Sequence, residues 1–295
     1  MTAFRGAFTA LVTPFREGAI DEDALRLLVE RQIEGGVHGL VPCGTTGESV
    51  VLNEQETRQV IRTVVAQARG RVPVVAGAGT NDTRKTIALA SLAKDEGVDG
   101  LLLVCPYYNK PTQRGLEAHF RAVLREVSLP TMLYNIPGRC SVDLSVETLH
   151  RLTDLSDIVA IKEATGTVAR AQEILARCGD RIAVLSGDDA LTLPMMAVGA
   201  VGVVSVTSNL LPAEMARLVT CLLEGRVTEA RALNQQLLAV HEALFVEANP
   251  GPVKGAMAAA KLLAPEIRLP LVWPEEATVA GVQHALQGVT GKGDR

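Results

Sequence analysis

The sequence predicts an α/β protein, a (β/α)8 TIM barrel followed by a C-terminal helical extension. Short apolar segments rich in β-branched residues alternate eight times with longer amphipathic segments, and Gly or Pro separates most of them. After residue 225 only helical periodicity remains. Eight strand–helix repeats in one chain favour a closed parallel barrel. An open doubly wound sheet is the alternative, but it usually has fewer strands, and its glycine fingerprint is missing after the first strand.

The individual elements follow from periodicity, caps and turn residues. Asp21 and Asn53 each stand directly before an amphipathic segment, where their side chains can cap a helix. Strands are expected at residues 8–13, 39–42, 72–76, 100–105, 131–135, 158–162, 182–186 and 201–206. Helices are expected at residues 21–34, 53–68, 83–96, 113–127, 145–152, 167–178 and 189–198, with an eighth ending at 224.

The part of the chain after the barrel contains three helical segments, at residues 228–246, 253–263 and 274–287. Pro250 and Pro252 are expected to interrupt the first two. We therefore divide the chain into a catalytic barrel, residues 1–225, and a helical extension, residues 226–295. The extension is expected to serve packing or oligomer contacts.

Composition excludes several classes of partner. A chain of 295 residues that is 47% hydrophobic can bury one large core. The net charge of −4, scattered Arg and Lys, and only 3% aromatic residues argue against nucleic-acid binding. No apolar run reaches transmembrane length, and the N-terminus lacks a signal pattern, so we expect a cytoplasmic protein without a membrane partner. The five cysteines are odd in number and lack Cys-x-x-Cys spacing, which favours reduced thiols.

The chemically most informative stretch is the sixth strand, residues 158–162, which ends in Lys162. A lysine at the end of a buried strand is costly to keep as an ammonium, because desolvation lowers its pKa. A neutral amine there is a nucleophile toward carbonyl carbon and can form a Schiff base. Taken alone, a lysine whose end reaches solvent is the commoner arrangement. The polar residues at the other strand ends favour the alternative, in which Lys162 is a buried, neutral and reactive amine.

Polar residues gather at the carboxyl ends of the other strands, where barrel enzymes place their reactive groups. After the second strand, Gly44-Thr-Thr-Gly-Glu48 offers hydroxyls and backbone N–H groups that suit a small carboxylate, although for this loop taken alone an ordinary capped turn is the better interpretation. Tyr134 ends the fifth strand, and a phenol near an amine can pass protons during imine formation. Arg139 offers a planar fork for a second carboxylate. No histidine has metal-ligand spacing, so we expect neither a metal nor a cofactor.

Together these residues resemble the dihydrodipicolinate synthase family, part of the pyruvate-dependent superfamily that includes N-acetylneuraminate lyase. The resemblance runs from residue 6 to about residue 268. Each motif alone is modest evidence, but their order at successive strand ends is specific. The motifs are Gly44-Thr-Thr-Gly-Glu48, Pro106-Tyr-Tyr-Asn109, Tyr134-Asn-Ile-Pro-Gly-Arg139, Ile161-Lys-Glu-Ala164, Ser186-Gly-Asp-Asp189 and Asn249-Pro-Gly-Pro-Val-Lys254.

The resemblance implies an enzyme that condenses pyruvate with aspartate semialdehyde to 4-hydroxy-tetrahydrodipicolinate in lysine and diaminopimelate biosynthesis. It implies a homotetramer built as a dimer of dimers. Lys162 would form the imine with pyruvate, and a proton relay would consist of Thr45, Tyr134 and, from a neighbouring subunit, Tyr108. The implied substrate-binding residues are Thr45 and Thr46 for the pyruvate carboxylate, Gly187 and Val204 in the pyruvate pocket, and Arg139 for the semialdehyde carboxylate.

The sequence departs from the family pattern in two respects. Cys140-Ser141 follows Arg139 where the family more often has Thr-Gly, which affects the aldehyde pocket but not the imine chemistry. In lysine-inhibited members a histidine and a glutamate occupy the positions of Glu54 and Lys85. A lysine ammonium would meet Lys85 where it needs a carboxylate, so we expect an enzyme that lysine inhibits weakly or not at all. Ser49, Asn81 and Tyr107 still match this regulatory cleft.

Two other functions remain open on the sequence. A sister aldolase could act on a hydroxy-oxoglutarate or a keto-sugar acid, and Arg139 argues against the sugar acids more than against the former. A catalytically silent barrel that binds a small acid is the alternative from another class. The intact set of Lys162, Tyr134, Tyr108 and Thr45 argues against it.

Overall fold

The computed structural model describes residues 4–290, and its centre is a parallel eight-stranded sheet. The strands run in the order β4-β1-β10-β9-β8-β7-β6-β5. A parallel bridge between Leu40 and Val74 joins the two ends of this order into a barrel. The predicted fold class is confirmed. The strands are β1 (Gly6–Ala10), β4 (Gly39–Val41), β5 (Val75–Gly77), β6 (Gly100–Val104), β7 (Thr131–Asn135), β8 (Ile158–Glu163), β9 (Ala183–Ser186) and β10 (Gly202–Ser205).

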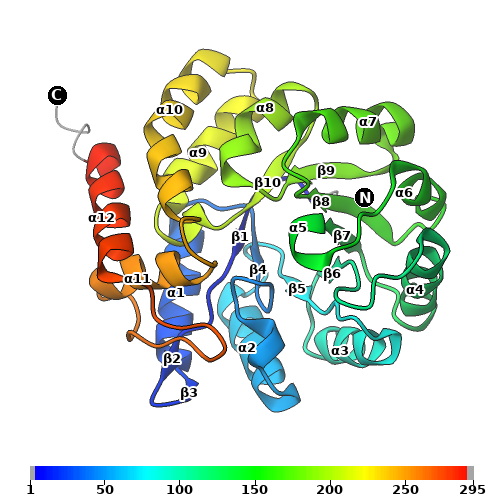
Figure 1. Cartoon of the computed structure of the whole chain (residues 1–295), viewed down its shortest axis with the longest axis horizontal. Helices are drawn as coiled ribbons and strands as arrows, with labels where there is room; N and C mark the ends of the chain where they lie inside the picture. The colour runs from blue at the N-terminus through cyan, green and yellow to red at the C-terminus, as the bar shows by residue number, and fades with distance from the viewer. Residues whose placement is uncertain (1–3, 291–295) are drawn as a thin grey trace.

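Helices follow the strands and surround the barrel (Figure 1). The predicted caps are confirmed: the Asp21 side chain accepts from the backbone N–H of Ala24, and Asn53 forms a capping box with Glu56. Such caps satisfy backbone donors that a helix end leaves free. The barrel helices are α1 (Glu22–Glu34), α2 (Glu54–Ala68), α3 (Thr83–Asp95), α4 (Gln113–Glu126), α6 (Val146–Leu152), α7 (Val168–Cys178), α8 (Thr192–Ala197) and α9 (Pro212–Leu223).

Several boundaries differ from the sequence prediction. The first strand ends at Ala10 rather than at residue 13. The backbone N–H of Leu11 still donates to Val41, but that of Val12 donates to the Asn209 side chain instead of to a neighbouring strand. The hairpin of β2 (Phe15–Arg16) and β3 (Ala19–Ile20) was missed. So was α5 (Pro137–Cys140), which is too short for periodicity to reveal. The segment expected as one helix from 189 starts with a 3₁₀ turn, since the Asp189 carboxylate turns inward to accept backbone N–H groups.

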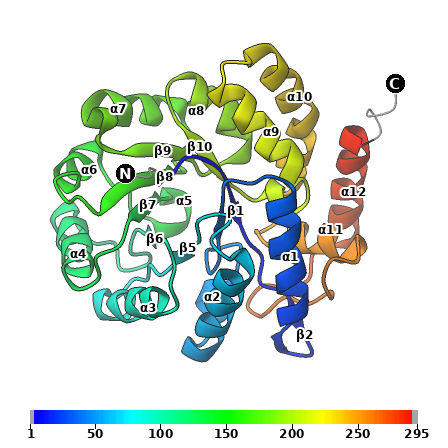
Figure 2. The ribbon, with the colours of Figure 1, turned by 180° about the vertical axis from the view of Figure 1, so that it is seen from behind.

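The C-terminal helices are α10 (Val227–Ala243), α11 (Gly251–Ala259) and α12 (Glu276–Thr290). Figures 1 and 2 show α11 and α12 beside α10 at one side of the barrel. Pro252 does not interrupt a helix as predicted but lies in the first turn of α11, where a missing N–H costs nothing. Leu237 and Met257 join the apolar cluster of α9, so this part is continuous with the barrel's packing. No helix within residues 4–290 has the length and apolar composition needed to cross a membrane.

Candidate active site

Lys162 is the fifth residue of β8, and only 6% of its surface is exposed. In the parallel pairing of β7 and β8 it lies beside Tyr134, and its Nζ is 4.1 Å from the centre of the Tyr134 ring. Burial lowers the pKa of Lys162 to about 8, while Asp189 acts in the opposite direction and Arg139 in the same one. The side chain predicted to be the nucleophile therefore carries a much larger fraction of free amine near physiological pH than an exposed lysine does.

Tyr134 connects this amine to Thr45. The Tyr134 side chain is buried, and burial raises the pKa of its phenol, which therefore stays protonated at neutral pH. A side-chain hydrogen bond with Thr45 acts on the same pKa in the opposite direction. The structure thus brings together three of the four residues predicted to be catalytic: an amine, a phenol and a hydroxyl.

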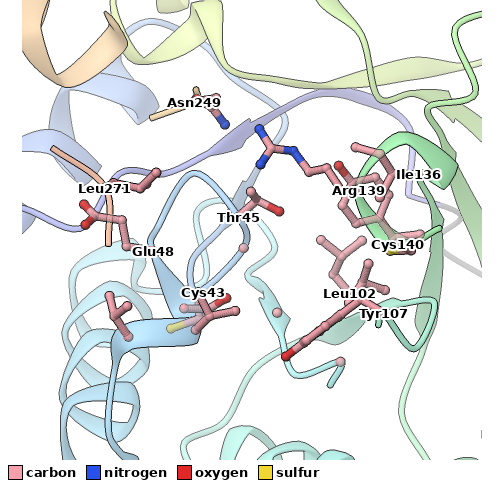
Figure 3. A pocket seen from close by; sticks show the side chains of 18 of the residues that line it. Cys43, Thr45, Glu48, Leu102, Tyr107, Ile136, Arg139, Cys140, Asn249 and Leu271 are labelled. Carbon is pink, nitrogen blue, oxygen red and sulfur yellow. The ribbon is translucent and has the colours of Figure 1, made fainter. Parts of the chain in front are cut away.

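A cavity of about 300 Å³ opens at this end of the barrel. Thr45 and Tyr134 line it, and Arg139 extends its guanidinium from α5 toward the middle of the cavity (Figure 3). Residues Pro270 and Leu271, which come from beyond α11, contribute to the wall. The cavity therefore has a phenol, a hydroxyl and a guanidinium converging on one space, in an otherwise largely apolar lining.

Gly187 leaves room for the lysine. A Cβ atom built on Gly187 would lie 3.1 Å from Lys162 Cε and 2.7 Å from Ala164 Cβ, so a larger residue would displace the amine. Val204, on β10, is buried in the barrel-interior cluster that also contains Tyr134. Lys162, Gly187 and Val204 lie outside the lining of the 300 Å³ cavity. The Tyr134 ring, which contacts the amine and lines the cavity, connects the two.

Thr46 is buried in the loop of residues 44–48, and its Oγ1 accepts a hydrogen bond of 3.0 Å from Asn249 Nδ2. Sequence reasoning had quoted Asn249 only as part of a motif and gave it no role. It also gave none to Lys254, whose ammonium lies 2.6 Å from Glu48 Oε1. The sole signal for both was the spacing within the Asn249 to Lys254 motif.

Not all of the residues predicted at the mouth of the barrel line the cavity. Tyr108 is 87% exposed and lies outside the cavity lining. Of the predicted regulatory cleft, Ser49 and Tyr107 line the cavity. The other members, Glu54, Asn81 and Lys85, do not, and two of them are exposed at the starts of α2 and α3.

Fold and site together define a barrel enzyme with a buried lysine at a strand end, beside a tyrosine ring. The model of the dihydrodipicolinate synthetase family matches residues 3–288, and the chain belongs to that family. It is 53% identical over 268 residues to the 4-hydroxy-tetrahydrodipicolinate synthase of Pelobacter propionicus, covering 91% of this chain and 92% of the relative. It is also 53% identical over 274 residues to the enzyme of that name from Geotalea uraniireducens, covering 93% and 94%.

Solved structures of synthases are also similar to this chain. The 4-hydroxy-tetrahydrodipicolinate synthase of Methylacidiphilum fumariolicum SolV superposes with a TM-score of 0.96 at 45% identity, covering 98% of this chain and 97% of that one. The dihydrodipicolinate synthase of Aquifex aeolicus gives 0.95 at 44% identity, covering 97% and 98%.

Proposed function

We propose that this enzyme condenses pyruvate with L-aspartate 4-semialdehyde to 4-hydroxy-tetrahydrodipicolinate through a Schiff base at Lys162. The observation that carries the proposal is the buried amine of Lys162 against the Tyr134 ring, with a pKa lowered to about 8. At pH 8 about half of the molecules would carry a free amine at Lys162, whereas an exposed lysine is almost entirely ammonium. Relatives about half identical carry the name of this activity.

The chemistry begins when the Lys162 amine attacks the keto carbon of pyruvate. The nitrogen loses its two protons, the former keto oxygen gains two and departs as water, and an imine remains. Tyr134 and Thr45 are placed to carry these protons, because the phenol stays protonated at neutral pH and is hydrogen-bonded to the Thr45 side chain. Thr45 and Thr46 would hold the pyruvate carboxylate, with Gly187 and Val204 beside the bound keto acid.

The second substrate enters from the mouth. Transfer of a proton from the pyruvate methyl group to the imine nitrogen gives an enamine, whose carbon attacks the aldehyde carbon while the aldehyde oxygen takes up a proton and becomes a hydroxyl. Arg139 would hold the carboxylate of aspartate semialdehyde, since its guanidinium points into the cavity (Figure 3). Attack of the substrate's own amino group on the imine carbon closes the ring and releases Lys162.

The exposure of Tyr108 supports a site completed by another subunit. A phenol that is 87% exposed, on a residue with φ of 73°, is held outward where a neighbouring copy could receive it. We therefore propose that Tyr108 completes the proton relay of a partner subunit in a homotetramer, a dimer of dimers. The location we propose is the cytoplasm, where amino-acid biosynthesis supplies both substrates.

Borohydride reduction in the presence of pyruvate tests the covalent step. It converts an imine into a stable secondary amine, so a pyruvate-derived mass increase on the Lys162 peptide is expected. Protein incubated with borohydride alone is the control. Comparing condensation with aspartate semialdehyde against cleavage of sugar acids then tests the substrate. Absence of the adduct, or faster turnover of sugar acids, would contradict the proposal.

A further inference from the structure

The 44–48 loop, which in the proposed function holds the pyruvate carboxylate, is attached to the C-terminal extension (residues 226–290). Asn249 Nδ2 donates to Thr46 Oγ1 over 3.0 Å. Lys254 Nζ, on α11, donates to Glu48 Oε1 over 2.6 Å. The backbone N–H of Arg268 donates to the other carboxylate oxygen over 3.0 Å. These contacts join residues more than 200 positions apart in the chain.

The ion pair is dry and fixed from several sides. The Lys254 side chain is fully buried and that of Glu48 is 1% exposed. Lys254 Nζ also donates to the backbone oxygen of Thr13 over 3.1 Å and stands 4.5 Å above the centre of the Phe15 ring. A buried pair holds its geometry tightly when the remaining donors and acceptors are also satisfied, as here.

The loop needs such support because its backbone is strained. Glu48 has φ of 54° and Cys43, directly before the loop, has φ of 56°, and both side chains are buried. Non-glycine residues in this left-handed region persist where the surrounding structure over-determines them. The contacts of the Glu48 carboxylate supply that constraint at one end of the loop.

Asn249 also determines whether the Thr46 hydroxyl is free to donate a hydrogen bond. A hydroxyl has one hydrogen to donate and two lone pairs that accept. Because the Asn249 amide N–H occupies a lone pair, the hydrogen of Thr46 is left free to donate to an anion. Asn249 itself lines the cavity, with 6% of its surface exposed, and its Oδ1 has no partner among the described residues.

We propose that the C-terminal extension is a positioning device for pyruvate, in which Asn249 orients the Thr46 hydroxyl and Lys254 fixes the loop through Glu48. The proposal rests on the proposed function, since it assigns the carboxylate of pyruvate to this loop. It gives the extension a role beyond the packing or oligomer contacts expected from sequence. Asn249 and Lys254 are positioning residues that act through Thr46 and Glu48.

The test measures how much pyruvate half-saturates borohydride trapping at Lys162 in the full-length protein. Asn249→Leu keeps the number and branching of side-chain atoms but cannot donate, so half-saturation should need about five- to tenfold more pyruvate. Asn249→Asp can only accept, which consumes the Thr46 hydrogen and adds a negative charge, so the increase should be larger. The maximum trapped fraction at saturating pyruvate should stay unchanged. A purely structural role would lower that fraction instead.

Matched variants separate positioning from general damage. Asn234→Leu makes the same substitution on α10, outside the cavity lining, and should leave half-saturation within twofold of the parent. In a Thr46→Val background Asn249→Leu should add less than twofold, because the acceptor is already gone. Glu48→Leu with Lys254→Met replaces the ion pair by apolar side chains and should also raise half-saturation. Urea unfolding checks that each variant is folded.

Failures of the two proposals are distinguishable. If the parent protein forms no pyruvate adduct, the proposed function is wrong. If the parent forms it and folded Asn249→Leu half-saturates within twofold of the parent, the positioning proposal is overturned. Should that variant not fold, Asn249→Asp carries the test, because it leaves Thr46 in place but cannot donate to its hydroxyl. An unchanged half-saturation in folded Asn249→Asp overturns the proposal equally.

Discussion

Two lysines are buried among the described residues, and their surroundings differ in one respect. Lys254 is fully buried with a carboxylate oxygen 2.6 Å from its nitrogen, and a backbone carbonyl accepts a second hydrogen bond. Lys162 is nearly as buried, but no carboxylate among the described residues forms an ion pair with it, and its Nζ stands 4.1 Å from the centre of the Tyr134 ring. Burial lowers the pKa of both, and for Lys254 the carboxylate of Glu48 opposes this directly.

The difference shows that pairing, rather than depth, decides what a buried lysine does. A carboxylate within hydrogen-bond distance stabilises the ammonium form, and the resulting pair is a structural connection. Without such a partner the charged form is disfavoured, and the amine becomes available as a nucleophile. The four predictions that follow test this contrast, beginning with the largest effect.

Lys162→Ala should abolish catalysis while leaving the fold intact. Without the amine there is no imine, so turnover should fall by at least about 10³-fold and the pyruvate adduct should disappear. Stability should not fall correspondingly, because the substitution removes no ion pair. Steady-state turnover and trapping mass spectrometry measure the effect, with Lys110→Ala, an exposed lysine, as the matched control. Undiminished turnover would refute the assignment of the nucleophile.

The burial of Lys162 near the end of a strand was predictable from the sequence because the signal is local. An apolar, β-branched run that ends in lysine can be read within one window, and so can the caps of α1 and α2. The role of Lys254 could not be read in this way, since its partner Glu48 is 206 residues away. Arg139 was predicted as a side chain at the mouth, but the short helix α5 that aims it was not. The positions of these side chains at strand ends and helix starts were predictable from the sequence, but their long-range partners in space were not.

Lys254→Met should have the opposite pattern to Lys162→Ala. It leaves the Glu48 carboxylate buried without its cation, which should reduce the free energy of unfolding by about 3–5 kcal/mol. Lys162→Met should cost far less stability, because no carboxylate is bonded to that amine. Urea unfolding of both variants measures the difference. Adding Glu48→Leu to Lys254→Met should restore most of the stability, and no recovery would contradict the assignment of the loss to an unpaired charge.

The pH dependence of trapping should report the Lys162 amine. Its pKa is lowered from 10.5 to about 8, so below pH 8 the reactive fraction falls about tenfold per pH unit, and above pH 8 the rate reaches a plateau. Between pH 8 and 10.5 the unfolded chain binds more protons at this position, so its contribution to stability improves as pH rises. Initial rates of trapping from pH 6 to 10 measure the profile. A plateau reached only near pH 10 would mean that burial does not free the amine.

The smallest effect concerns an exposed lysine at the start of α3. Lys85 stands in the first turn of that helix, where its backbone N–H donates to the Asp82 side chain. In the regulatory cleft predicted from sequence, a bound lysine would meet the Lys85 ammonium, and like charges at close range cost on the order of 1 kcal/mol. Lysine should therefore inhibit only above millimolar concentration, and Lys85→Glu should strengthen inhibition about fivefold or more. Steady-state rates across a lysine titration measure the parent and Lys85→Glu, with Lys94→Glu, near the end of the same helix, as control.

Half-inhibition of the parent at submillimolar lysine would show that the cleft tolerates the extra charge. In that case solvent would screen the charge of the exposed Lys85 ammonium as fully as the Glu48 carboxylate neutralises that of Lys254.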